Sequence, residues 1–362
     1  MRVIHVTPFY EPVWEAGGTA RAAAALCRAL AARGHSVTVV TAGAGRGPAE
    51  EERDGVRVLR LRSAPLSDRV LMPWAPRAGR LLRKLSRDAD LGHVHGHRSF
   101  LALAAARAFG SAGLPFVLEP HGTYPDHGQL AWAKRVFDTL AGGRVLRLAS
   151  VLVAKSEAEA RDLPRHAEVV PNGVESPAAP PKGAAGSRLL FVGNDRPQKR
   201  GLRLRRLLEA LPEARLDVVG PVGSSFRAAF AGFGPRVAFR GVLAPRALAA
   251  AYAAADLLVH PAVGEAFGLV AFEAALCATA GVVSADHGCG EWYARAGGAT
   301  VPADDDAALE WTVAARLRDP EARAAEARAV AAFAARELTW ATAGHRVEAL
   351  YTQLSAAAGR AP

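Results

Sequence analysis

The chain opens with short apolar runs that flank a longer segment of helical periodicity. Residues 2–10 (RVIHVTPFY) predict a strand followed by a turn, 19–34 (TARAAAALCRALAARG) predict a helix that ends at Gly34, and 35–41 (HSVTVVT) predict a second strand. The runs are too short for helices, whereas the middle segment is alanine-rich and long enough for one. A strand, a helix and a strand in this order form the repeating unit of a parallel, doubly wound sheet.

The same alternation fills two halves of the chain. Between them, residues 175–187 (ESPAAPPKGAAGS) have the Pro, Gly and Ala content of a linker. We therefore predict an α/β protein of two Rossmann-like doubly wound domains, at 1–174 and 188–335, that face a central cleft. Ligands of such sheets bind beyond the carboxyl ends of the strands, so the cleft is the predicted site. The further predicted strands are 56–62, 91–96, 116–122, 150–156, 169–174, 188–194, 215–223, 236–243, 256–263 and 281–286; helices are predicted at 201–211, 245–255 and 267–277, and from about 303 to the end.

Length and charge narrow the class of protein. A chain of 362 residues exceeds one comfortable hydrophobic core, which favours two domains. Its net charge of +10 predicts anionic partners, either phosphate-bearing ligands or a membrane surface, whereas no motif of nucleic-acid binding is present. Three widely spaced cysteines argue against a disulfide framework. No long apolar run or signal peptide is found, so we expect a cytoplasmic protein.

Two glutamates frame the start of the predicted helix at 267–277. Glu265 lies in the preceding loop, and Glu273 follows it with seven residues between them. The first amides of this helix, at Phe267, Gly268 and Leu269, lack intrahelical partners and carry the positive end of the helix dipole, so a phosphate can bind there. Carboxylates accept hydrogen bonds from sugar hydroxyls. A nucleotide-sugar fits this arrangement; the alternative is an ordinary helix with a chance pair of glutamates.

A basic loop follows the first strand of the second half. Residues 193–201 (GNDRPQKRG) contain Arg196, Lys199 and Arg200 between a strand and a helix. Guanidinium and ammonium groups both bind phosphate oxygens, so this loop and the Gly268 helix together suit a diphosphate. The alternative is a solvated basic loop.

The first half offers two further strand-end features. Gly17 and Gly18 (in EAGGTARA, 15–22) open the helix after the first strand, where a ligand can approach the backbone, and His121 follows strand 116–122. The pattern is not the G-x-G-x-x-G fingerprint, which disfavours NAD. A flexible turn and a structural histidine are the alternatives.

Three histidines alternate in HVHGH (93–97). A strand would place His93, His95 and His97 on one side, as a metal site requires. No carboxylate lies nearby in the sequence, and buried parallel strands often end in polar residues. We therefore expect no metal here.

Taken in order, these segments resemble the family 4 retaining glycosyltransferases with the GT-B fold. The resemblance covers nearly the whole chain, and its most specific element is the glutamate, seven residues, glutamate pattern in GEAFGLVAFEA (264–274). The other matching segments are the Gly-Gly loop at 17–18, HVHG at 93–96, HG at 121–122, PNGV at 171–174 and FVG at 191–193 with its basic loop.

The resemblance implies a role for each site residue. Glu265 would contact the donor sugar and Glu273 the ribose, while Arg196 and Lys199 would bind the diphosphate. The backbone near Val242 would lie beside the nucleobase. The final helix, about 340–360, would pack back on the first domain.

Two features depart from the family pattern. Asn194 stands where an arginine is common, and Arg200 lengthens the loop, so either Lys199 or Arg200 is the equivalent of the phosphate-binding lysine. HGCGEW (287–292) replaces a more usual Gly-Gly pair and leaves its contacts open, with Glu291 as its acidic residue.

The implied reaction transfers a sugar from a nucleoside diphosphate sugar, with UDP favoured, to a hydroxyl acceptor with retention. Glu265, His121, Arg196 and Lys199 are the expected catalytic residues, and Gly17, Gly18 and His121 are on the acceptor side, with Gly18 also near the donor. Protein cations would stabilise the leaving diphosphate, so neither a metal nor another cofactor is expected. The acceptor is either an envelope or lipid-linked glycan or a small natural-product aglycone.

A basic amphipathic segment lies at 69–87 (RVLMPWAPRAGRLLRKLSR). Its leucines share one arc and its basic side chains the other, so it either lies on an anionic membrane, with Trp74 as an anchor, or packs its leucines on the sheet.

Three rival functions are considered. A two-domain NAD-dependent oxidoreductase is disfavoured because neither half carries its glycine fingerprint. A non-catalytic relative that binds nucleotide-sugars and an epimerase or phosphorylase of the same fold stay as alternatives.

Overall fold

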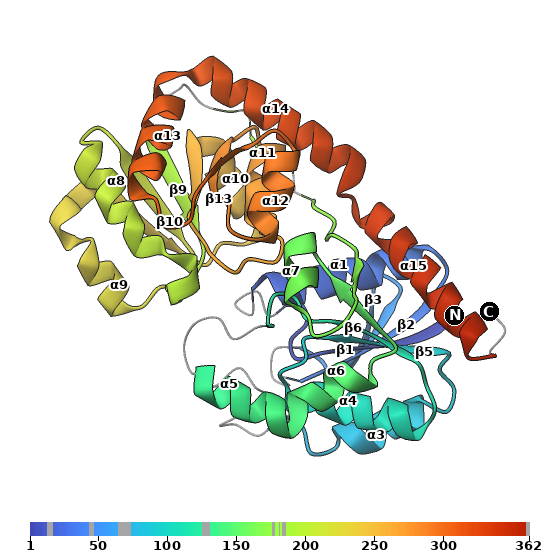
Figure 1. Ribbon diagram of the computed structural model, residues 1–362. Coiled ribbons are helices and arrows are strands. Elements are labelled where there is room, and N and C mark those ends of the chain that lie inside the picture. The colour runs from blue at the N-terminus through green and yellow to red at the C-terminus, as the bar shows by residue number, and fades with distance from the viewer. Residues whose placement is uncertain are drawn as a thin grey trace. The chain divides into compact units, whose positions relative to one another are not determined.

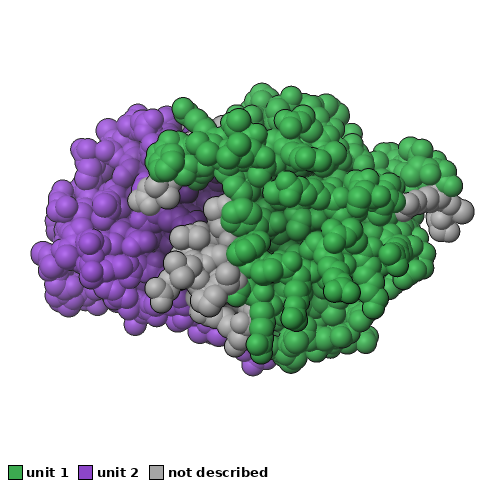
Figure 2. Space-filling view, turned by 90° about the horizontal axis from the view of Figure 1, so that it is seen from below, with its two compact units in different colours: residues 1–173, 340–362 green, residues 174–339 purple. Residues whose placement is uncertain are grey.

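The computed structural model describes residues 1–12, 17–42, 47–63, 74–124, 131–175, 178–180, 182 and 186–359. The chain divides into two compact units, Met1–Gly173 with Trp340–Pro362, and Val174–Thr339 (Figure 1, Figure 2). Both units are built on largely parallel sheets with helices on both faces, which confirms the predicted α/β class with two Rossmann-like domains. Among the described residues, no helix is long and apolar enough to cross a bilayer.

Unit 1 contains an eight-stranded sheet in the order β3-β4-β2-β1-β5-β6-β7-β8. All described strand pairs are parallel except β3 and β4, which form an antiparallel hairpin at the edge. The strands are β1 (Arg2–Thr7), β2 (Ser36–Ala42), β3 (Glu50–Arg53), β4 (Val56–Leu61), β5 (Leu91–His95), β6 (Phe116–Glu119), β7 (Val151–Ala154) and β8 (Glu168–Val169).

Helices cover both faces of this sheet (Figure 1). Side chains alternate along each strand, so Ile4 and Val94 pack under one helical layer and Val3 and Leu91 under the other. The first layer holds α3 (Ala78–Leu85), α4 (Phe100–Ser111) and α6 (Gly143–Leu148), and the second holds α1 (Gly18–Ala32) and α15 (Trp340–Ala357). The remaining helices are α5 (Ala131–Phe137), the π-helix η2 (Asp138–Gly142) and α7 (Glu157–Asp162).

The C-terminal helix α15 belongs to unit 1 because it packs on α1. Val347 and Tyr351 are buried in the same core cluster as Leu30 of α1. At the rim, Glu348 forms ion pairs with Arg33 and with His35, the latter over 3.0 Å if the imidazole is protonated.

Unit 2 contains a six-stranded parallel sheet in the order β11-β10-β9-β12-β13-β14. One face packs against α8, α9 and α13, and the other against α10, α11 and α12, while α14 runs along α11. The elements are β9 (Arg188–Val192), η3 (Pro197–Lys199), η4 (Gly201–Arg203), α8 (Leu204–Ala210), β10 (Arg215–Val219), α9 (Ser224–Ala229), η5 (Ala231–Arg236), β11 (Val237–Gly241), α10 (Pro245–Ala254), β12 (Leu257–His260), α11 (Leu269–Leu276), β13 (Gly281–Ser284), α12 (Gly288–Arg295), β14 (Ala299–Val301), α13 (Asp306–Arg318) and α14 (Pro320–Glu337).

Some elements differ from the sequence predictions. The segment after 303 is three helices, because the Asp319 side chain caps α14 by accepting from the Ala322 N–H and Pro320 begins that helix. The highly charged strand β3 was not predicted, although Asp54 and Gly55 both adopt positive φ and form the tight turn of its hairpin. The short strand β14 and the helix α12 were not predicted either.

Candidate functional site

Two loops of unit 2 meet beyond the carboxyl ends of β9 and β12. The Val263 N–H donates to the Gln198 carbonyl over 2.8 Å, which ties the loop after β12 to the loop after β9. The Lys199 ammonium forms an ion pair with the Glu265 carboxylate across these loops. Because β9 and β12 are hydrogen-bonded neighbours, the sheet topology brings the predicted basic loop and the first glutamate together.

A buried histidine adjoins this ion pair. The Nε2 atom of His260, at the end of β12, lies 3.9 Å from Oε2 of Glu265. Burial and the nearby Lys199 ammonium lower the pKa of His260 to about 4, although Glu265 opposes the shift, so the imidazole is neutral. Burial raises the pKa of the Glu265 carboxyl, but Lys199 and His260 outweigh it and hold that pKa below its usual 4.5. The carboxylate is therefore ionised and accepts hydrogen bonds.

Gly268 shapes the start of α11. It is the N-cap residue, with φ = 73°, in the left-handed region that favours glycine, so the helix begins at Leu269 rather than at the predicted Phe267. A Cβ atom on Gly268 would lie 2.1 Å from Sγ of Cys289. The Cys289 N–H also donates to the Glu265 carbonyl over 3.1 Å. The HGCG loop, whose contacts the sequence left open, thus supports both residues.

The side chain of Phe267 is not available at this turn. The Phe267 side chain is buried and stacks on Phe272 with ring centroids 5.4 Å apart, so the ring is committed to the core. The amides that open α11 are what this segment offers to an anion.

Whereas Glu265 lies in the loop before α11, Glu273 lies within that helix. Its side chain is buried, and its Oε2 accepts a hydrogen bond from the Tyr252 hydroxyl over 2.9 Å. Tyr252, on α10, was not identified from the sequence, because nothing in its local pattern distinguishes it from a core tyrosine. It fixes the orientation of the carboxylate that the sequence assigned to a ribose.

The structure distinguishes the three basic residues of the loop after β9. Arg200 adopts φ = 49° and directs its guanidinium to the Ala303 carbonyl and the Asp304 carboxylate, each over 2.7 Å. Lys199 points to Glu265 instead. Arg196 is exposed and has no ion pair with the described residues, and its N–H donates to Oδ1 of Asn194 over 3.2 Å. Asn194, the departure from the family pattern, thus stabilises this loop.

Two peripheral predicted residues lie on nearby strand ends. Val242 follows β11, and 46% of it is exposed. Glu291 lies in the first turn of α12, whose N-cap residue is His287, and the His287 ring accepts from the Gly264 N–H over 3.2 Å.

In unit 1 the predicted residues lie at the carboxyl ends of β1 and β6. Gly17 is the N-cap residue of α1 with φ = 84°, and Gly18 is the first residue of that helix. His121 follows β6 with φ = 55°, and its Nε2 lies 3.0 Å from Nδ1 of His95. Residues 13–16 and 125–130, which adjoin these positions, lie outside the described residues.

Comparisons with known proteins decide the family. A glycosyl transferase 4-like domain matches residues 17–175, and a glycosyl transferases group 1 domain matches residues 186–319. A D-inositol 3-phosphate glycosyltransferase of Kineococcus radiotolerans is 31% identical over 89% of this chain and 87% of its own length. The chain belongs to the family 4 glycosyltransferases. A second relative with that name, from Xylanimonas cellulosilytica, is 29% identical over 98% of this chain and 96% of its own.

Solved structures show that this glycosyltransferase has the GT-B fold. Sucrose-phosphate synthase from Thermosynechococcus elongatus matches 98% of this chain and 99% of its own with a TM-score of 0.77 and 21% identity. Alr3699/HepE from Anabaena, in complex with UDP-glucose, matches 98% of this chain and 100% of its own with a TM-score of 0.77 and 19% identity. At these identities the likeness shows the fold alone. These structures therefore confirm the GT-B fold, whereas the family domains and the named relatives support a hexosyltransferase-type enzyme.

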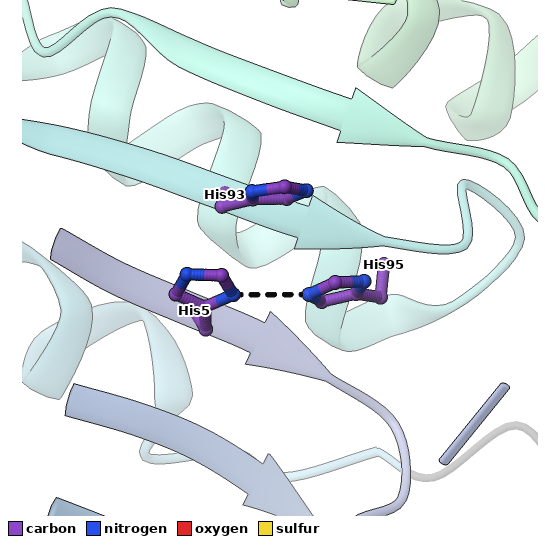
Figure 3. A group of neighbouring side chains, drawn as sticks. All are labelled: His5, His93 and His95. Carbon is purple, nitrogen blue, oxygen red and sulfur yellow. Dashed lines mark hydrogen bonds between the residues drawn. The ribbon is translucent and has the colours of Figure 1, made fainter. Parts of the chain in front are cut away.

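The glycosyltransferase also contains a buried polar cluster that the sequence revealed only in part. His5 of β1 lies beside His93 and His95 of β5 on the neighbouring strand (Figure 3). This sheet face packs against α1 and α15. Nδ1 of His5 lies 3.0 Å from Nε2 of His95, and the His93 and His95 rings stack with centroids 4.6 Å apart. Tyr351 of α15 adds its hydroxyl, 2.6 Å from Nδ1 of His93 and 3.2 Å from Nε2 of His5.

His97 does not join this cluster. The prediction that it shares one side with His93 and His95 is wrong, because β5 ends at His95 and Gly96 turns the chain with φ = 77°. Nδ1 of His97 lies 2.9 Å from the Thr123 hydroxyl instead.

A carboxylate completes the cluster. Glu119 of β6 is the register partner of His95. Strand pairing therefore brings a carboxylate to the histidines although none lies near HVHGH in the sequence. Its Oε1 lies 2.8 Å from Nζ of Lys155, and its Oε2 lies 3.2 Å from Nε2 of His121. Burial raises the pKa of Glu119, but Lys155 and the imidazoles outweigh it, so that pKa lies well below 4.5. The carboxylate is ionised.

A glutamate of α7 anchors the turn at His121. Glu159 of α7 accepts from the Gly122 N–H and, over 2.7 Å, from the Lys155 N–H. These bonds hold the left-handed turn at His121 and Gly122. Glu159 could not be identified from the sequence, since glutamate in a first helical turn is common.

Proposed function

We propose that this glycosyltransferase moves a sugar from a nucleoside diphosphate sugar, with a UDP-sugar favoured, to a hydroxyl acceptor with retention of configuration. The observation that carries the proposal is the Lys199 and Glu265 ion pair beside the opening amides of α11. A cation and free helix amides suit a diphosphate, and a carboxylate suits sugar hydroxyls. The UDP-glucose complex of the structural relative HepE supports the same donor class.

Charge stabilisation is assigned to protein groups. Lys199, Arg196 and the amides after Gly268 would stabilise the negative charge that grows on the leaving diphosphate. Glu265 holds Lys199 in place before the donor binds, which reduces the reorganisation that the reaction needs. We propose that no divalent metal takes part. The attack would occur on the same face as departure, with the leaving phosphate as base, so no side-chain nucleophile is assigned.

Glu273 is assigned to the ribose hydroxyls. Because Tyr252 orients the carboxylate, Glu273 can accept hydrogen bonds in a fixed direction. Val242 is assigned to the nucleobase through its backbone.

The acceptor contacts are assigned to Gly17, Gly18 and His121 of unit 1. The relatives named D-inositol 3-phosphate glycosyltransferase favour a phosphorylated cyclitol among the candidate acceptors, and the net charge of +10 suits an anionic one. A lipid-linked glycan is the other candidate.

A thermal-shift screen with UDP, GDP, ADP, TDP and their sugars, in EDTA, tests the donor assignment. A donor raises the melting temperature by mass action, and we expect the largest rise with one uridine ligand. If the rise appeared only when Mg²⁺ replaced EDTA, the metal-free site would be contradicted. No rise with any nucleotide would remove the residue assignments.

Product analysis separates the alternative functions. NMR of the product's anomeric configuration tests retention. A non-catalytic relative would show a thermal shift without donor hydrolysis or transfer, whereas an epimerase or phosphorylase would convert the donor without an acceptor.

We also propose peripheral contact with an anionic membrane, with its apolar part on α5 and η2 rather than on α3. Residues 69–73 of the predicted amphipathic segment lie outside the described residues. Leu82 of α3 is buried and Leu81 and Leu85 pack against the core, so the leucine arc is used inside the unit and its basic side chains remain exposed. The exposed apolar side chains recur every fourth residue along α5 and η2, at Trp132 (70%), Val136 (50%) and Leu140 (76%).

Basic residues adjoin this apolar stripe. Arg135 of α5 is exposed, as are Arg144 and Arg147 of α6, the helix that directly follows η2. Apolar side chains beside basic ones are typical of a surface that binds anionic lipid.

A further inference from the structure

The buried cluster of unit 1 forms one continuous hydrogen-bonded chain that ends at His121. Starting from the Tyr351 hydroxyl, the contacts run to His5, from His5 to His95 and from His95 to His121, over 3.2, 3.0 and 3.0 Å. The two inner imidazoles use both ring nitrogens. One proton occupies each contact, so the tautomer of every ring depends on that of its neighbour.

The cluster is better explained by protons than by a metal ion. Two groups, one of His5, His93 and His95 and one of His95, Glu119 and His121, have ligand atoms within 4.8 Å of one another. However, the His93 and His95 rings are within 10° of parallel and stacked, so their in-plane lone pairs do not converge. The Lys155 ammonium beside Glu119 would also repel a cation.

The ionised Glu119 decides the direction of the protons. A carboxylate accepts hydrogen bonds only, and it lies 3.4 Å from Nε2 of His93 and 3.2 Å from Nε2 of His121. If both atoms carry protons, His93 accepts at Nδ1 from the Tyr351 hydroxyl over 2.6 Å. The Tyr351 oxygen then accepts from Nε2 of His5.

The remaining proton positions in the hydrogen-bonded series follow from the protons placed on His93 and His121. His5 accepts at Nδ1 from Nε2 of His95. His95 accepts at Nδ1 from Nε2 of His121, whose single proton is shared between His95 and Glu119. His121 is left with an unprotonated Nδ1, and among the described residues this atom has no hydrogen-bond partner.

The opposite direction is electrostatically worse. It places the bare nitrogens of His93 and His121 against the Glu119 carboxylate, whereas the first direction places only Nδ1 of His95 there, at 3.4 Å. In a site buried from water, such contacts are costly. Burial also lowers the pKa of His121 below the usual 6.5, although Glu119 opposes the shift, so the ring is neutral.

We propose that Tyr351, His5, His95 and Glu119 are positioning residues that fix His121 as the Nε2–H tautomer, so that its Nδ1 accepts a hydrogen bond from a substrate hydroxyl. The proposal rests on the proposed function in one respect: it takes His121 as a substrate contact. It also makes the site selective for a hydroxyl over a carbonyl or an anionic oxygen at that position, because these groups only accept.

The test is the tautomer of His121, read from the ring nitrogen shifts of ¹⁵N-histidine-labelled protein at pH 7, with His121→Asn used to assign the signal. We expect a neutral ring protonated at Nε2. A ring protonated at Nδ1, or at both nitrogens, would overturn the proposal. Because this readout needs no turnover, the tautomer can be established even if no nucleotide-sugar proves to be a donor, and the two failures remain distinguishable.

Variants test the role of the distant residues. Tyr351→Phe should populate the second tautomer of His121 and raise KM about twofold with kcat unchanged, because the competent fraction falls. Tyr293→Phe is the matched control: it also removes a buried hydroxyl, which accepts from the Gly281 N–H over 2.8 Å in unit 2, and should leave the His121 signal unchanged. If the two variants gave the same His121 signal and the same KM, the proposal would be contradicted.

A double variant tests the contribution of the Glu119 carboxylate separately. Glu119→Gln with Lys155→Met removes both buried charges together, so no unpaired charge remains. We expect the second tautomer to dominate and KM to rise about tenfold. An unchanged His121 signal in a folded double variant would overturn the proposal.

Discussion

Lys199 and Glu265 form an ion pair across two loops of unit 2 although they are 66 positions apart in the chain. The loop after β9 supplies the cation and the loop after β12 supplies the carboxylate, and a backbone hydrogen bond from Val263 to Gln198 joins the two loops. Arg200, directly after Lys199, turns away to Asp304. Lys199 and Arg200, although adjacent, therefore point to different carboxylates.

Lys199→Ala should lower kcat for sugar transfer by about 10²- to 10³-fold, as loss of one charge-stabilising group does in other enzymes. Arg200→Ala is the matched control, since its guanidinium is bound to Ala303 and Asp304, and should lower kcat less than about tenfold. Steady-state kinetics with the donor found in the thermal-shift screen would measure both. If Arg200→Ala proved the more severe, the assignment of the diphosphate to Lys199 would be wrong.

The Glu265 ion pair should make stability depend on pH in the acid range. Lys199 and His260 hold the pKa of Glu265 below its usual 4.5, so the pair stabilises the fold above pH 4.5 and this contribution is lost as pH falls through the lowered value. We expect the difference in unfolding free energy between the wild type and Glu265→Gln to be constant from pH 7 to 5 and to shrink below 4.5. Urea unfolding at several pH values measures it. A difference that grew toward low pH would contradict this sign.

Gly268→Ala should destabilise unit 2 more than a left-handed backbone alone explains. The new Cβ would meet both a positive φ and Sγ of Cys289, for a cost of roughly 1–2 kcal/mol from the backbone and about 1–3 kcal/mol more from overpacking. Gly297→Ala provides the control, because φ is 86° there and the nearest atom, Cβ of Ala329, is 3.9 Å away. Thermal unfolding of both variants separates the cost of backbone strain from the cost of overpacking. If both variants lost the same stability, a costly contact with Cys289 would be ruled out.

Trp132→Ser should weaken binding to vesicles that contain anionic lipid by at least about tenfold, because the indole would no longer enter the interface. Trp311 of unit 2 is similarly exposed, at 73% against 70% for Trp132, so Trp311→Ser controls for the loss of a surface tryptophan. Co-sedimentation with phosphatidylglycerol vesicles measures both. Equal binding of the two variants and the wild type would exclude α5 as the contact.

Much of the fold and part of the site follow from local sequence patterns. The apolar runs and the alanine-rich segments predict the two doubly wound sheets because side-chain periodicity is a property of each segment alone. Glu265, Gly268 and the basic loop were found because residues at strand ends and helix starts carry chemistry wherever the strands later lie. The hairpin of β3 could have been found from Asp54 and Gly55, despite its charged residues.

Other features depended on contacts between distant segments. Nothing local distinguishes Tyr252, which orients Glu273, from any core tyrosine. The different contacts of Lys199 and Arg200 follow from the φ of 49° at Arg200 and from the position of Asp304. His5 and Tyr351 touch across 346 positions, and Glu119 reaches His95 only through strand register.

By itself, the sequence determined the class of fold, the family and the chemical groups that stand at the strand ends, because these depend on periodicity and on residue type. The tertiary structure decided which of those groups face one another, since sheet order and strand register are set by the burial of whole apolar faces. In this glycosyltransferase that ordering unites Lys199 with Glu265 and links the C-terminal Tyr351 to His121 through buried imidazoles.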